Sequence, residues 1–383
     1  MKTLFKFTLF VIFTSFLLLS KVLGNDKIRI GLVVPLSGEY SLIGDSIVKS
    51  TRLALNKIKN EKFEIVPMDS KANPIDTLKV SKKLSAKGIK IIIGPVFNGS
   101  SKYLDELSDV TFISFTNKIY GNPSNVISAG VNAISQLQTI DKFRKLNDIQ
   151  RSIILIPKSD YQKEIEQALK KTNLKIKDKF YYDTDPTLLT SQIEKITRYP
   201  ERKRNLIDEI KRIEDNELIN KEKKLDNLKK KDTLGGINFD SVIIADFNES
   251  LKSVATSLLY TDVSSKRVSY ITLNQWFDNS LLKETALQPI YFPSINKENY
   301  EIFQNEYNKA YLKKANQLSF LSYDLVGLIY FLIYNNDFNA NKEIFYKKNK
   351  FKGKIGVFEI DKNTITHQLN FYSVNEEQFI KIF

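Results

Sequence analysis

Small hydroxyl side chains follow three apolar segments in the first third of the sequence, and they are the residues best suited to binding chemistry. They are Ser37 beside Gly38, Ser100 beside Ser101, and Ser114 close to Thr116. Hydroxyls and the free backbone N–H groups of such turns suit a carboxylate or another small polar ligand. Each set alone also fits ordinary turn and helix-cap chemistry. Three sets at one edge of a sheet favour a ligand cleft.

Residue types that would support catalysis or metal binding are scarce. The chain has no cysteine and one histidine, His367, which we expect in a solvated polar turn between the last two strands. One histidine without a placed partner cannot define a Ser-His-Asp triad, and the sequence has neither a G-x-S-x-G turn nor a glycine-rich phosphate motif. No group of His, Cys and carboxylate residues has metal-ligand spacing. We therefore predict a protein that is not an enzyme and has no metal or cofactor.

The hydroxyl residues follow strands of the kind found in parallel sheets. The stretch 27–56 opens with the apolar run Ile28–Val34, breaks at Pro35 and continues with apolar residues at helical spacing. The same alternation of short strand and helix continues to residue 131 and resumes from residue 134. Open parallel sheets bind their ligands at the carboxyl ends of strands. The sequence therefore predicts an α/β fold whose strand-end turns line one cleft.

The length and the N-terminus indicate an exported protein with two domains. A chain of 383 residues is long enough for two α/β domains. Residues 1–24 combine Lys2 and Lys6 with a short apolar core and a small-residue cleavage site, the pattern of a signal peptide, with an uncleaved membrane anchor as the alternative. Since the chain has no cysteine for a lipid anchor, we expect a soluble periplasmic protein with no stable membrane insertion after cleavage.

Charge patterning points away from nucleic acid and toward a separate helical element. The formal charge is +14, but no Lys/Arg block is interleaved with aromatic residues as a nucleic-acid groove requires. Residues 200–232 carry dense charges of both signs and a narrow apolar stripe at helical spacing. This segment predicts a charged helical insertion. It is either a solvated surface element or a docking arm for a partner protein.

Several segments together are similar to a known family. The segment IGLVVPLSGEYSLIGDSIVKSTRLAL resembles the first strand, turn and helix of the leucine-binding-protein family, the type I periplasmic binding proteins. IIIGPVFNGSS and TFISFTN resemble its next ligand-loop segments, ILIPKSDYQKE resembles the first strand and turn of its second lobe, and FKGKIGVFEIDKNTITHQLNFYSV resembles its terminal hairpin. The resemblance covers essentially the whole mature chain.

The resemblance implies two lobes, each a parallel sheet flanked by helices, joined by three crossovers and closing on a ligand by hinge motion. The boundaries we expect are 27–131 plus 289–340 for the N-terminal lobe and 132–288 plus 341–383 for the C-terminal lobe. It implies that Ser100 or Ser101 holds a ligand carboxylate, that Ser114 and Thr116 complete this grip, and that Tyr161 lines the second lobe. Glu249, or else Asp246, would meet an amino-acid ammonium group.

Departures from the family pattern bear on the ligand. Amino-acid-binding members carry an aromatic residue where this sequence has Ile43, and a glycine where it has Gln162. These differences argue against a branched-chain amino acid. The function implied is the substrate-binding component of an ABC importer, with a small amino-acid-like or carboxylate solute and an ABC permease as partners.

A second resemblance concerns the latter half. The charged insertion, followed by NFDSVIIADFNESL and the segment around Trp276, LLYTDVSSKRVSYITLNQWFDNSLLKE, is similar to a subgroup called penicillin-binding-protein activators. That subgroup lacks a transport role and contacts a peptidoglycan synthase. The alternative function is therefore regulation of peptidoglycan synthesis through protein contacts on the same fold, with Trp276 also counted among the candidate site residues.

Overall fold

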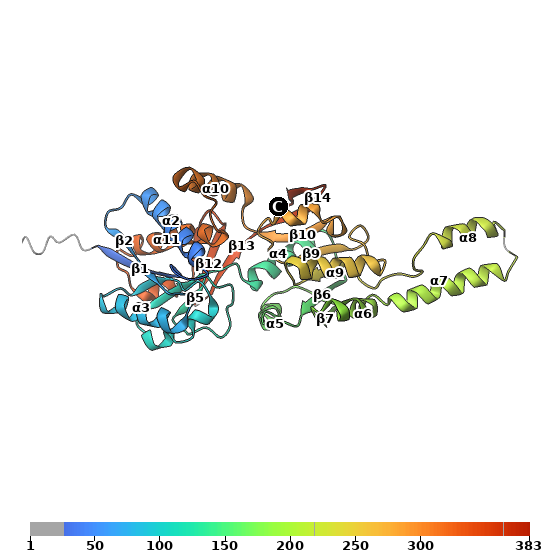
Figure 1. Ribbon diagram of the computed structural model, residues 1–383, viewed down its shortest axis with the longest axis horizontal. Helices are drawn as coiled ribbons and strands as arrows, with labels where there is room; N and C mark the ends of the chain where they lie inside the picture. Colours follow the sequence, from blue (N-terminus) through green and yellow to red (C-terminus); the bar gives the residue numbers. More distant parts are fainter. Residues whose placement is uncertain (1–26, 218, 363) are drawn as a thin grey trace, which may run out of the picture.

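Two β-sheets, each between helices, form two lobes that lie side by side (Figure 1). The computed structural model describes residues 27–217, 219–362 and 364–383, so the predicted signal peptide, residues 1–24, lies outside the described residues. The first sheet has the strand order β11-β12-β13-β5-β4-β3-β1-β2, and the second has the order β15-β14-β10-β9-β8-β6-β7. The predicted two-lobed α/β fold is confirmed, but the sheets are mixed and not purely parallel, because antiparallel strands from the last part of the chain extend one edge of each.

Continuous apolar runs form the centre of both sheets, because a strand covered by helices on both faces is buried on both faces. The strands of the first sheet are β1 (Ile28–Val34), β2 (Phe63–Asp69), β3 (Ile91–Ile93), β4 (Thr111–Ser114), β5 (Val126–Ser128), β11 (Asn349–Lys352), β12 (Val357–Asp361) and β13 (Thr364–Gln368). Those of the second are β6 (Ser152–Pro157), β7 (Asp178–Tyr182), β8 (Ser241–Ile244), β9 (Ser269–Thr272), β10 (Ile290–Ser294), β14 (Asn370–Asn375) and β15 (Gln378–Lys381).

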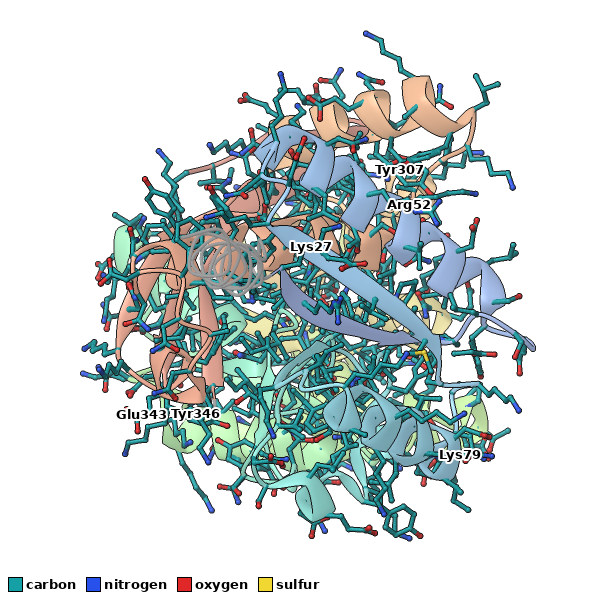
Figure 2. All side chains as sticks on the ribbon, turned by 90° about the vertical axis from the view of Figure 1, so that its left-hand side faces the viewer. Lys27, Arg52, Lys79, Tyr307, Glu343 and Tyr346 are labelled. Atoms are coloured by element: carbon teal, nitrogen blue, oxygen red, sulfur yellow. The ribbon has the colours of Figure 1, made fainter. Side chains whose placement is uncertain are left out.

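Helices cover both faces of each sheet. In the first lobe, α2 (Ser41–Ile58), α10 (Lys297–Tyr311) and α11 (Gln317–Tyr334) share one hydrophobic core, and α3 (Pro74–Ala86) belongs to a second. Figure 2 shows this division, with Arg52 of α2 and Tyr307 of α10 on one side of the sheet and Lys79 of α3 on the other. Helix α11 is apolar and long enough to cross a membrane, but most of it is buried against α2 and the sheet, as in a core helix.

The second lobe repeats this three-layer arrangement. Its helices are α4 (Ala133–Leu146), α5 (Gln162–Lys170), α6 (Pro186–Ile196) and α9 (Asn248–Tyr260). Helices α4 and α5 pack on one face of the sheet, and α6 and α9 pack on the other. Short 3₁₀ turns, η1 (Asn98–Ser101), η2 (Leu104–Leu107), η3 (Asn279–Lys283), η4 (Thr285–Leu287) and η5 (Lys342–Phe345), complete the connections.

The predicted lobe boundaries need two corrections. Strand β10 pairs in parallel with β9 and antiparallel with β14, so residues 290–294 belong to the second lobe and not to the first. Strands β11, β12 and β13 join the first sheet through β5, so residues 349–368 belong to the first lobe and not to the second. The chain therefore crosses between the lobes after β5, where the first crossover was predicted, and after β10 and β13, which are both later in the sequence than predicted.

The segment predicted to form one terminal hairpin instead contributes strands to two hairpins, one in each sheet. β12 pairs with β13, whereas β14 pairs with β15. We had expected His367 in a solvated turn, but it lies in β13 and is buried, with 3% of its surface exposed. Its Nε2 lies 2.9 Å from the carbonyl oxygen of Ala129. Burial lowers the pKa of His367 to about 4. The residue is thus a neutral structural element near a crossover.

A buried carboxylate joins α11 to the loop between β11 and β12. Asp324, 3% exposed, accepts hydrogen bonds from the backbone N–H groups of Lys354 at 2.9 Å and Ile355 at 2.6 Å. Burial raises the pKa of Asp324 to about 6, from an ordinary value of 3.8. The carboxyl group therefore binds a proton more readily in the folded protein than in the unfolded chain.

We expect this group to make the free energy of unfolding fall as the pH rises from about 4 to about 6. Between about pH 4 and about pH 6 the folded state still holds a proton on Asp324 that the unfolded state has lost. Stability therefore falls as the pH rises through this window and stays lower above about pH 6. A shift of about two pKa units corresponds to roughly 3 kcal/mol. Urea unfolding at a series of pH values should show the fall in the wild type and a shallower one in Asp324→Asn. Identical pH profiles for the two proteins would contradict the assignment.

Two helices, α7 (Tyr199–Glu214) and α8 (Lys221–Lys229), occupy most of the segment 200–232 and project from the second lobe (Figure 1). Leu206, Ile213 and Leu228 form a small core of their own between the two helices. The root of this arm is held by Arg202, which is 3% exposed and donates to the carbonyl oxygens of Thr197 and Thr261 and to the hydroxyl of Thr233. The arm is therefore anchored at a defined point.

Replacing Arg202 with alanine is expected to loosen the arm and not the lobes. The variant leaves three buried acceptors without their charged donor, a loss of about 3 kcal/mol in local stability. Hydrogen exchange should accelerate across residues 199–234 while the sheet strands keep their protection. Arg204→Ala, which removes an exposed arginine of the same helix, is the control and should leave exchange unchanged. Equal exchange in Arg202→Ala and wild type would rule out the anchoring role.

Candidate functional site

The first predicted ligand turn is tied to a neighbouring strand. The backbone N–H of Leu36 and the hydroxyl of Ser37 donate to the two carboxylate oxygens of Asp69, at 2.8 and 2.6 Å. Gly38 follows with a φ of +76°, a left-handed conformation that glycine adopts without strain. Ser37 and Gly38 are exposed and line none of the cavities described below. The hydrogen bonds to Asp69 fix the turn, and the hydroxyl of Ser37 already donates to that carboxylate.

The next two hydroxyl sets behave differently from each other. Ser100 and Ser101 lie in η1, almost fully buried, and neither hydroxyl has a hydrogen-bond partner among the described residues. Ser114 donates to the carbonyl oxygen of Pro95 at 2.8 Å and accepts from the N–H of Thr116 at 3.2 Å. Of these four residues, Thr116 lines the cleft cavity. Ser114 therefore shapes the loop that presents Thr116.

Three predicted residues of the second lobe, Tyr161, Asp246 and Glu249, do not line the cleft cavities. Tyr161 packs against Phe247, with its hydroxyl buried and without a described partner. Asp246 accepts hydrogen bonds from the hydroxyl of Tyr182 and from the N–H of Phe247, and burial raises its pKa. Glu249 stands in the first turn of α9 with a side chain 85% exposed and pairs with Lys252 at 2.9 Å. The expected ammonium-binding carboxylate is thus either occupied or turned to solvent.

Two adjoining cavities lie between the lobes, with volumes of about 430 and 340 Å³. They share Asn117, Val131 and Trp276. The larger cavity lies mainly on the first lobe and is lined by Val96, Phe97, Asn98, Phe115, Thr116, Lys118, Gly130, Leu318 and Leu321. The smaller one reaches the second lobe and is lined by Gln136, Phe247, Asn248, Asn274, Gln275, Asp278 and Gln317. Thr116 and Trp276 are the predicted site residues that the fold brings into this cleft.

The cleft combines an apolar wall with one cation and several carboxamides. Phe97, Phe115 and Trp276 supply aromatic surface, and Tyr40 lies against Phe97 with ring centroids 4.7 Å apart. Lys118 is the charged residue of the larger cavity. In the smaller cavity, Asp278 is engaged by the backbone N–H and the hydroxyl of Ser280, at 2.9 and 2.8 Å. Lys118 makes no ion pair with a described residue, although its charge acts on the carboxylate of Glu164, and a cation beside an apolar wall suits a small organic anion.

Trp276 occupies this position because of the turn that follows β9. Trp276 and Phe277 both have left-handed backbones, with φ of +50° and +58°, a conformation that is uncommon for bulky residues. The carboxamide of Asn274 accepts from the N–H of Trp276 at 3.0 Å and from the hydroxyl of Ser294 at 2.8 Å, which stabilises the turn. The side chain of Gln136 in turn accepts from the N–H of Asn274 at 2.8 Å.

One carboxylate connects the lobes directly. Glu164 of α5, in the second lobe, accepts hydrogen bonds from the backbone N–H groups of Ile119 and Tyr120, both at 3.2 Å, in the β4–β5 loop of the first lobe. Ile119 packs on the hydrophobic core of the second lobe beside it. Burial raises the pKa of Glu164. This contact holds the two lobes together at one end of the cleft.

Removing the Glu164 contact is expected to favour a more open arrangement of the lobes. Glu164→Ala leaves two N–H groups of the β4–β5 loop without their acceptor, so the closed arrangement loses stability relative to the open one. The radius of gyration from small-angle X-ray scattering should rise, and the apparent affinity of the cleft for its ligand should fall about tenfold. Glu166→Ala on the same helix is the control, since Glu166 bonds to Gln162 and not to the other lobe. A radius unchanged by Glu164→Ala would contradict the interlobe role.

Sequence reasoning missed the charged and carboxamide residues of the cleft. Three of these residues stand next to the predicted hydroxyl residues in the sequence: Asn98 in FNGSS, and Asn117 and Lys118 in SFTNK. Their position just after a strand could have identified them as candidates. Their side chains are the ones that reach the cavity. Asn274 and Gln136 come from separate elements of the second lobe, and their contact could not be read from spacing. The structure describes no group of His, Cys, Asp and Glu residues arranged to hold a metal ion.

Comparisons with known proteins agree with this arrangement. A family model described as periplasmic binding protein matches residues 27–198. No protein of curated function matches the sequence. Among solved structures, a branched-chain amino acid transporter substrate-binding protein of Streptococcus pneumoniae, in complex with isoleucine, is 15% identical with a TM-score of 0.55, covering 93% of this chain and 99% of its own.

Two further structures extend the range of bound ligands. An ABC transporter substrate-binding protein of Desulfitobacterium hafniense, in complex with leucine, is 13% identical with a TM-score of 0.59 and covers 93% of this chain and 100% of its own. A solute-binding protein of an ABC transporter of Rhodopseudomonas palustris, in complex with 4-hydroxybenzoate, is 14% identical with a TM-score of 0.58 and covers 93% and 95%. The family model thus matches the first lobe and the start of the second, and the solved structures share the two-lobed fold of the type I periplasmic binding proteins over most of the chain.

Proposed function

We propose that the protein is the periplasmic substrate-binding component of an ABC importer and that it binds a small organic carboxylate between its lobes. The observation that carries the proposal is the larger cleft cavity, where Lys118 and two carboxamides adjoin the aromatic side chains of Phe97, Phe115 and Trp276. Lys118 would pair with the carboxylate, and the apolar wall would take the rest of the solute. Relatives of this fold that bind solutes for ABC transporters support the role and a non-enzymatic function.

The position of the acidic residues favours a simple carboxylate over an amino acid. A bound amino acid needs an acceptor for its ammonium group. Glu249 is exposed and paired with Lys252, and Asp246 is engaged by Tyr182. Asp278, the acid that lines the smaller cavity, is engaged by Ser280. The cleft thus offers a cation for the carboxylate and no disengaged anion for an ammonium group among the residues that line its two cavities.

Calorimetry with a matched ligand panel tests the proposal. Benzoate, 4-hydroxybenzoate and 4-methylpentanoate should be compared with leucine and isoleucine at pH 7.5. 4-Methylpentanoate is leucine without its ammonium group, so that pair isolates the ammonium. We expect at least one carboxylate to bind with micromolar affinity, and each amino acid to bind at least tenfold more weakly. The carboxylate assignment would be refuted if leucine or isoleucine bound more tightly than every carboxylate of the panel. It would also be refuted if no member of the panel bound.

The second candidate function is activation of a penicillin-binding protein through protein contacts. The observation that favours it is the anchored α7–α8 arm, which projects away from both the cleft and the other lobe. The comparisons with known proteins lend this role no support. Deletion of residues 203–232 should abolish capture of a peptidoglycan synthase if the arm is a docking element. Absence of capture by the intact chain would remove this candidate.

A further inference from the structure

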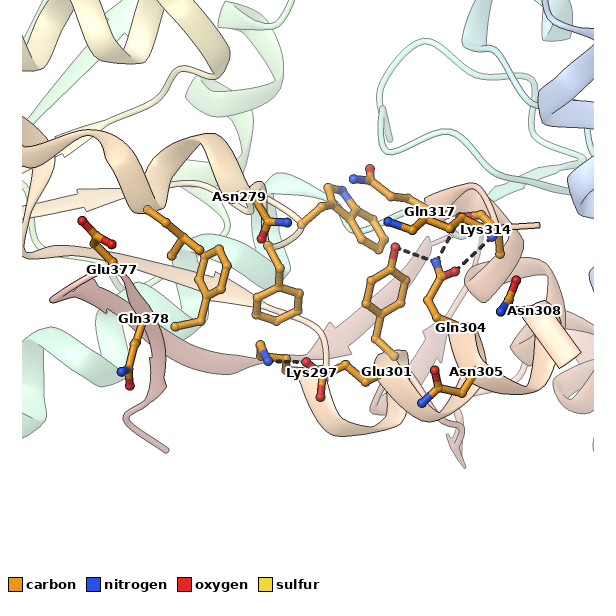
Figure 3. A pocket seen from close by; sticks show the side chains of 16 residues that line it. Asn279, Lys297, Glu301, Gln304, Asn305, Asn308, Lys314, Gln317, Glu377 and Gln378 are labelled. Atoms are coloured by element: carbon orange, nitrogen blue, oxygen red, sulfur yellow. Dashed lines mark hydrogen bonds and ion pairs between the residues drawn. The ribbon is translucent and has the colours of Figure 1, made fainter. Parts of the chain in front are cut away.

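A third cavity, larger than the two of the cleft, is also lined by Trp276. This groove has a volume of about 830 Å³ and runs between helix α10 of the first lobe and the β14–β15 hairpin of the second (Figure 3). Its lining includes Trp276, Phe277, Tyr300 and Phe379. Its size is in the range of small-molecule sites. The groove shares no strand-end hydroxyl with the cleft, so the function proposed above does not account for it.

Carboxamide side chains dominate the polar surface of the groove. Asn305 and Asn308 line it from exposed positions on α10, and Asn279, Gln317 and Gln378 line it from three other elements, as Figure 3 shows. These five side chains make no hydrogen bond to another described residue, whereas the neighbouring Gln304 is engaged by Tyr300 and Ala315. Each carboxamide offers two donors and an acceptor. Such a set pairs well with a ligand that carries many hydroxyl groups.

The charges of the groove are balanced. Lys297 pairs with Glu301 inside it, and the remaining charged residues are one cation, Lys314, and one anion, Glu377. An anionic or cationic ligand would gain no net attraction from this lining. A neutral polar ligand is favoured instead.

Aromatic rings give the groove a firm apolar surface. Phe277 is held by edge-to-face contacts with Tyr372 and Phe379, with ring centroids 4.9 and 5.5 Å apart. The left-handed backbones of Trp276 and Phe277 present both side chains from one tight turn, and residues held in such conformations concentrate at binding sites. Fixed aromatic rings beside free carboxamides match a ligand with apolar ring faces and a polar rim.

The geometry points to a second binding site in this groove for a neutral saccharide of one or two pyranose units. The apolar faces of the sugar rings would pack on Trp276 and Tyr300, and their hydroxyl groups would bond to Asn305, Asn308 and Gln378. Because these residues come from both lobes, a bound saccharide would bridge them near the hinge. Trp276 also lines both cleft cavities and Gln317 also lines the smaller one, so the two sites share two residues.

Fluorescence provides a direct test, since Trp276 is the only tryptophan of the sequence. The full mature chain should be titrated with glucose, N-acetylglucosamine, cellobiose and chitobiose, and each result should be repeated by calorimetry. We expect a saturable change in tryptophan emission with at least one of the four. The double variant Asn305→Ala/Asn308→Ala should weaken that binding at least tenfold, and both substitutions favour helix and should not impair folding. Asn227→Ala, an exposed carboxamide of α8, is the matched control and should bind as the wild type does.

The cleft variant Lys118→Gln separates this site from the function proposed above. It should retain saccharide binding while it loses carboxylate binding, and the double variant should show the reverse pattern. Saccharide binding that is lost in Lys118→Gln and kept in the double variant would place the sugar in the cleft and overturn the inference. The inference is also overturned if none of the four saccharides binds, or if a short neutral peptide such as tetra-alanine binds the groove more tightly than all of them.

Discussion

At pH 5, Asp324→Ala is expected to lower the free energy of unfolding by about 4 kcal/mol. The carboxyl group of Asp324 lies in the core of the first lobe and binds the backbone N–H groups of Lys354 and Ile355. Alanine offers no acceptor, so both N–H groups become buried and unpaired, at a cost of roughly 1–3 kcal/mol each. Urea unfolding followed by circular dichroism measures the loss.

The loss should be smaller at pH 7.5 than at pH 5. Above its raised pKa of about 6, the wild-type carboxyl is charged and buried, which already reduces the stability of the wild type. The alanine variant has no such charge, so the difference between the two proteins narrows as the pH rises. A loss below 1 kcal/mol at pH 5, or a loss that grows with pH, would show that Asp324 does not anchor this loop.

A glycine in the same loop supplies an independent check. A Cβ added to Gly353 would collide with a carboxylate oxygen of Asp324 and lie 2.8 Å from the ring of Phe358. Gly353→Ala should therefore also destabilise the first lobe. Gly236→Ala is the control, because a Cβ at Gly236 meets no atom within 4 Å.

The second large effect is expected in ligand binding. Lys118→Gln should weaken the carboxylate affinity of the cleft by about 30-fold, because a hydrogen bond to a charged group contributes roughly 1.5–3 kcal/mol. Glutamine keeps a donor of similar length, so the variant removes the charge with little change in shape. Calorimetry with the tightest carboxylate of the panel measures the change, and affinity should also become less sensitive to salt.

The control for Lys118→Gln is Lys79→Gln, an exposed lysine of α3 (Figure 2) that lines neither cleft cavity. It makes the same change in net charge, so it separates a local contact from the general field of this basic chain. Equal losses in both variants would mean that Lys118 acts only through the net charge. An unchanged affinity in Lys118→Gln would place the carboxylate elsewhere in the cleft.

Trp276 links the cleft, the groove and the hinge in one turn of chain. It lines both cleft cavities and the groove, and its turn is fixed by Asn274, Gln136 and Ser294. A ligand on either side of the indole would restrict its position on the other. Binding in the groove is therefore expected to alter carboxylate affinity, and linkage requires the reverse effect to be equal in free energy.

Local patterns in the sequence determined the elements of this protein. Apolar runs such as Ile28–Val34 can be covered on both faces only in a sheet between helices, which is why the α/β fold followed from the sequence. Helices within 200–232 were also expected, since an apolar stripe at helical spacing among dense charges favours amphipathic surface helices, and α7 and α8 lie there. The hydroxyl residues were correctly expected after strands, because strand ends are marked by local turn chemistry.

Contacts between distant segments decided the partition into lobes and the composition of the site. β10 and β13 are each followed by a crossover. Local sequence pattern does not determine that β10 pairs with β9 or that β13 pairs with β5, because these pairings join strands that are distant in the sequence. Ser37 became engaged by Asp69 and Asp246 by Tyr182, partners 32 and 64 residues away, which withdrew both from ligand binding. Lys118, Asn98 and Trp276 reach one cavity from three loops. A binding site depends on where side chains converge in space, and only the tertiary structure sets that convergence.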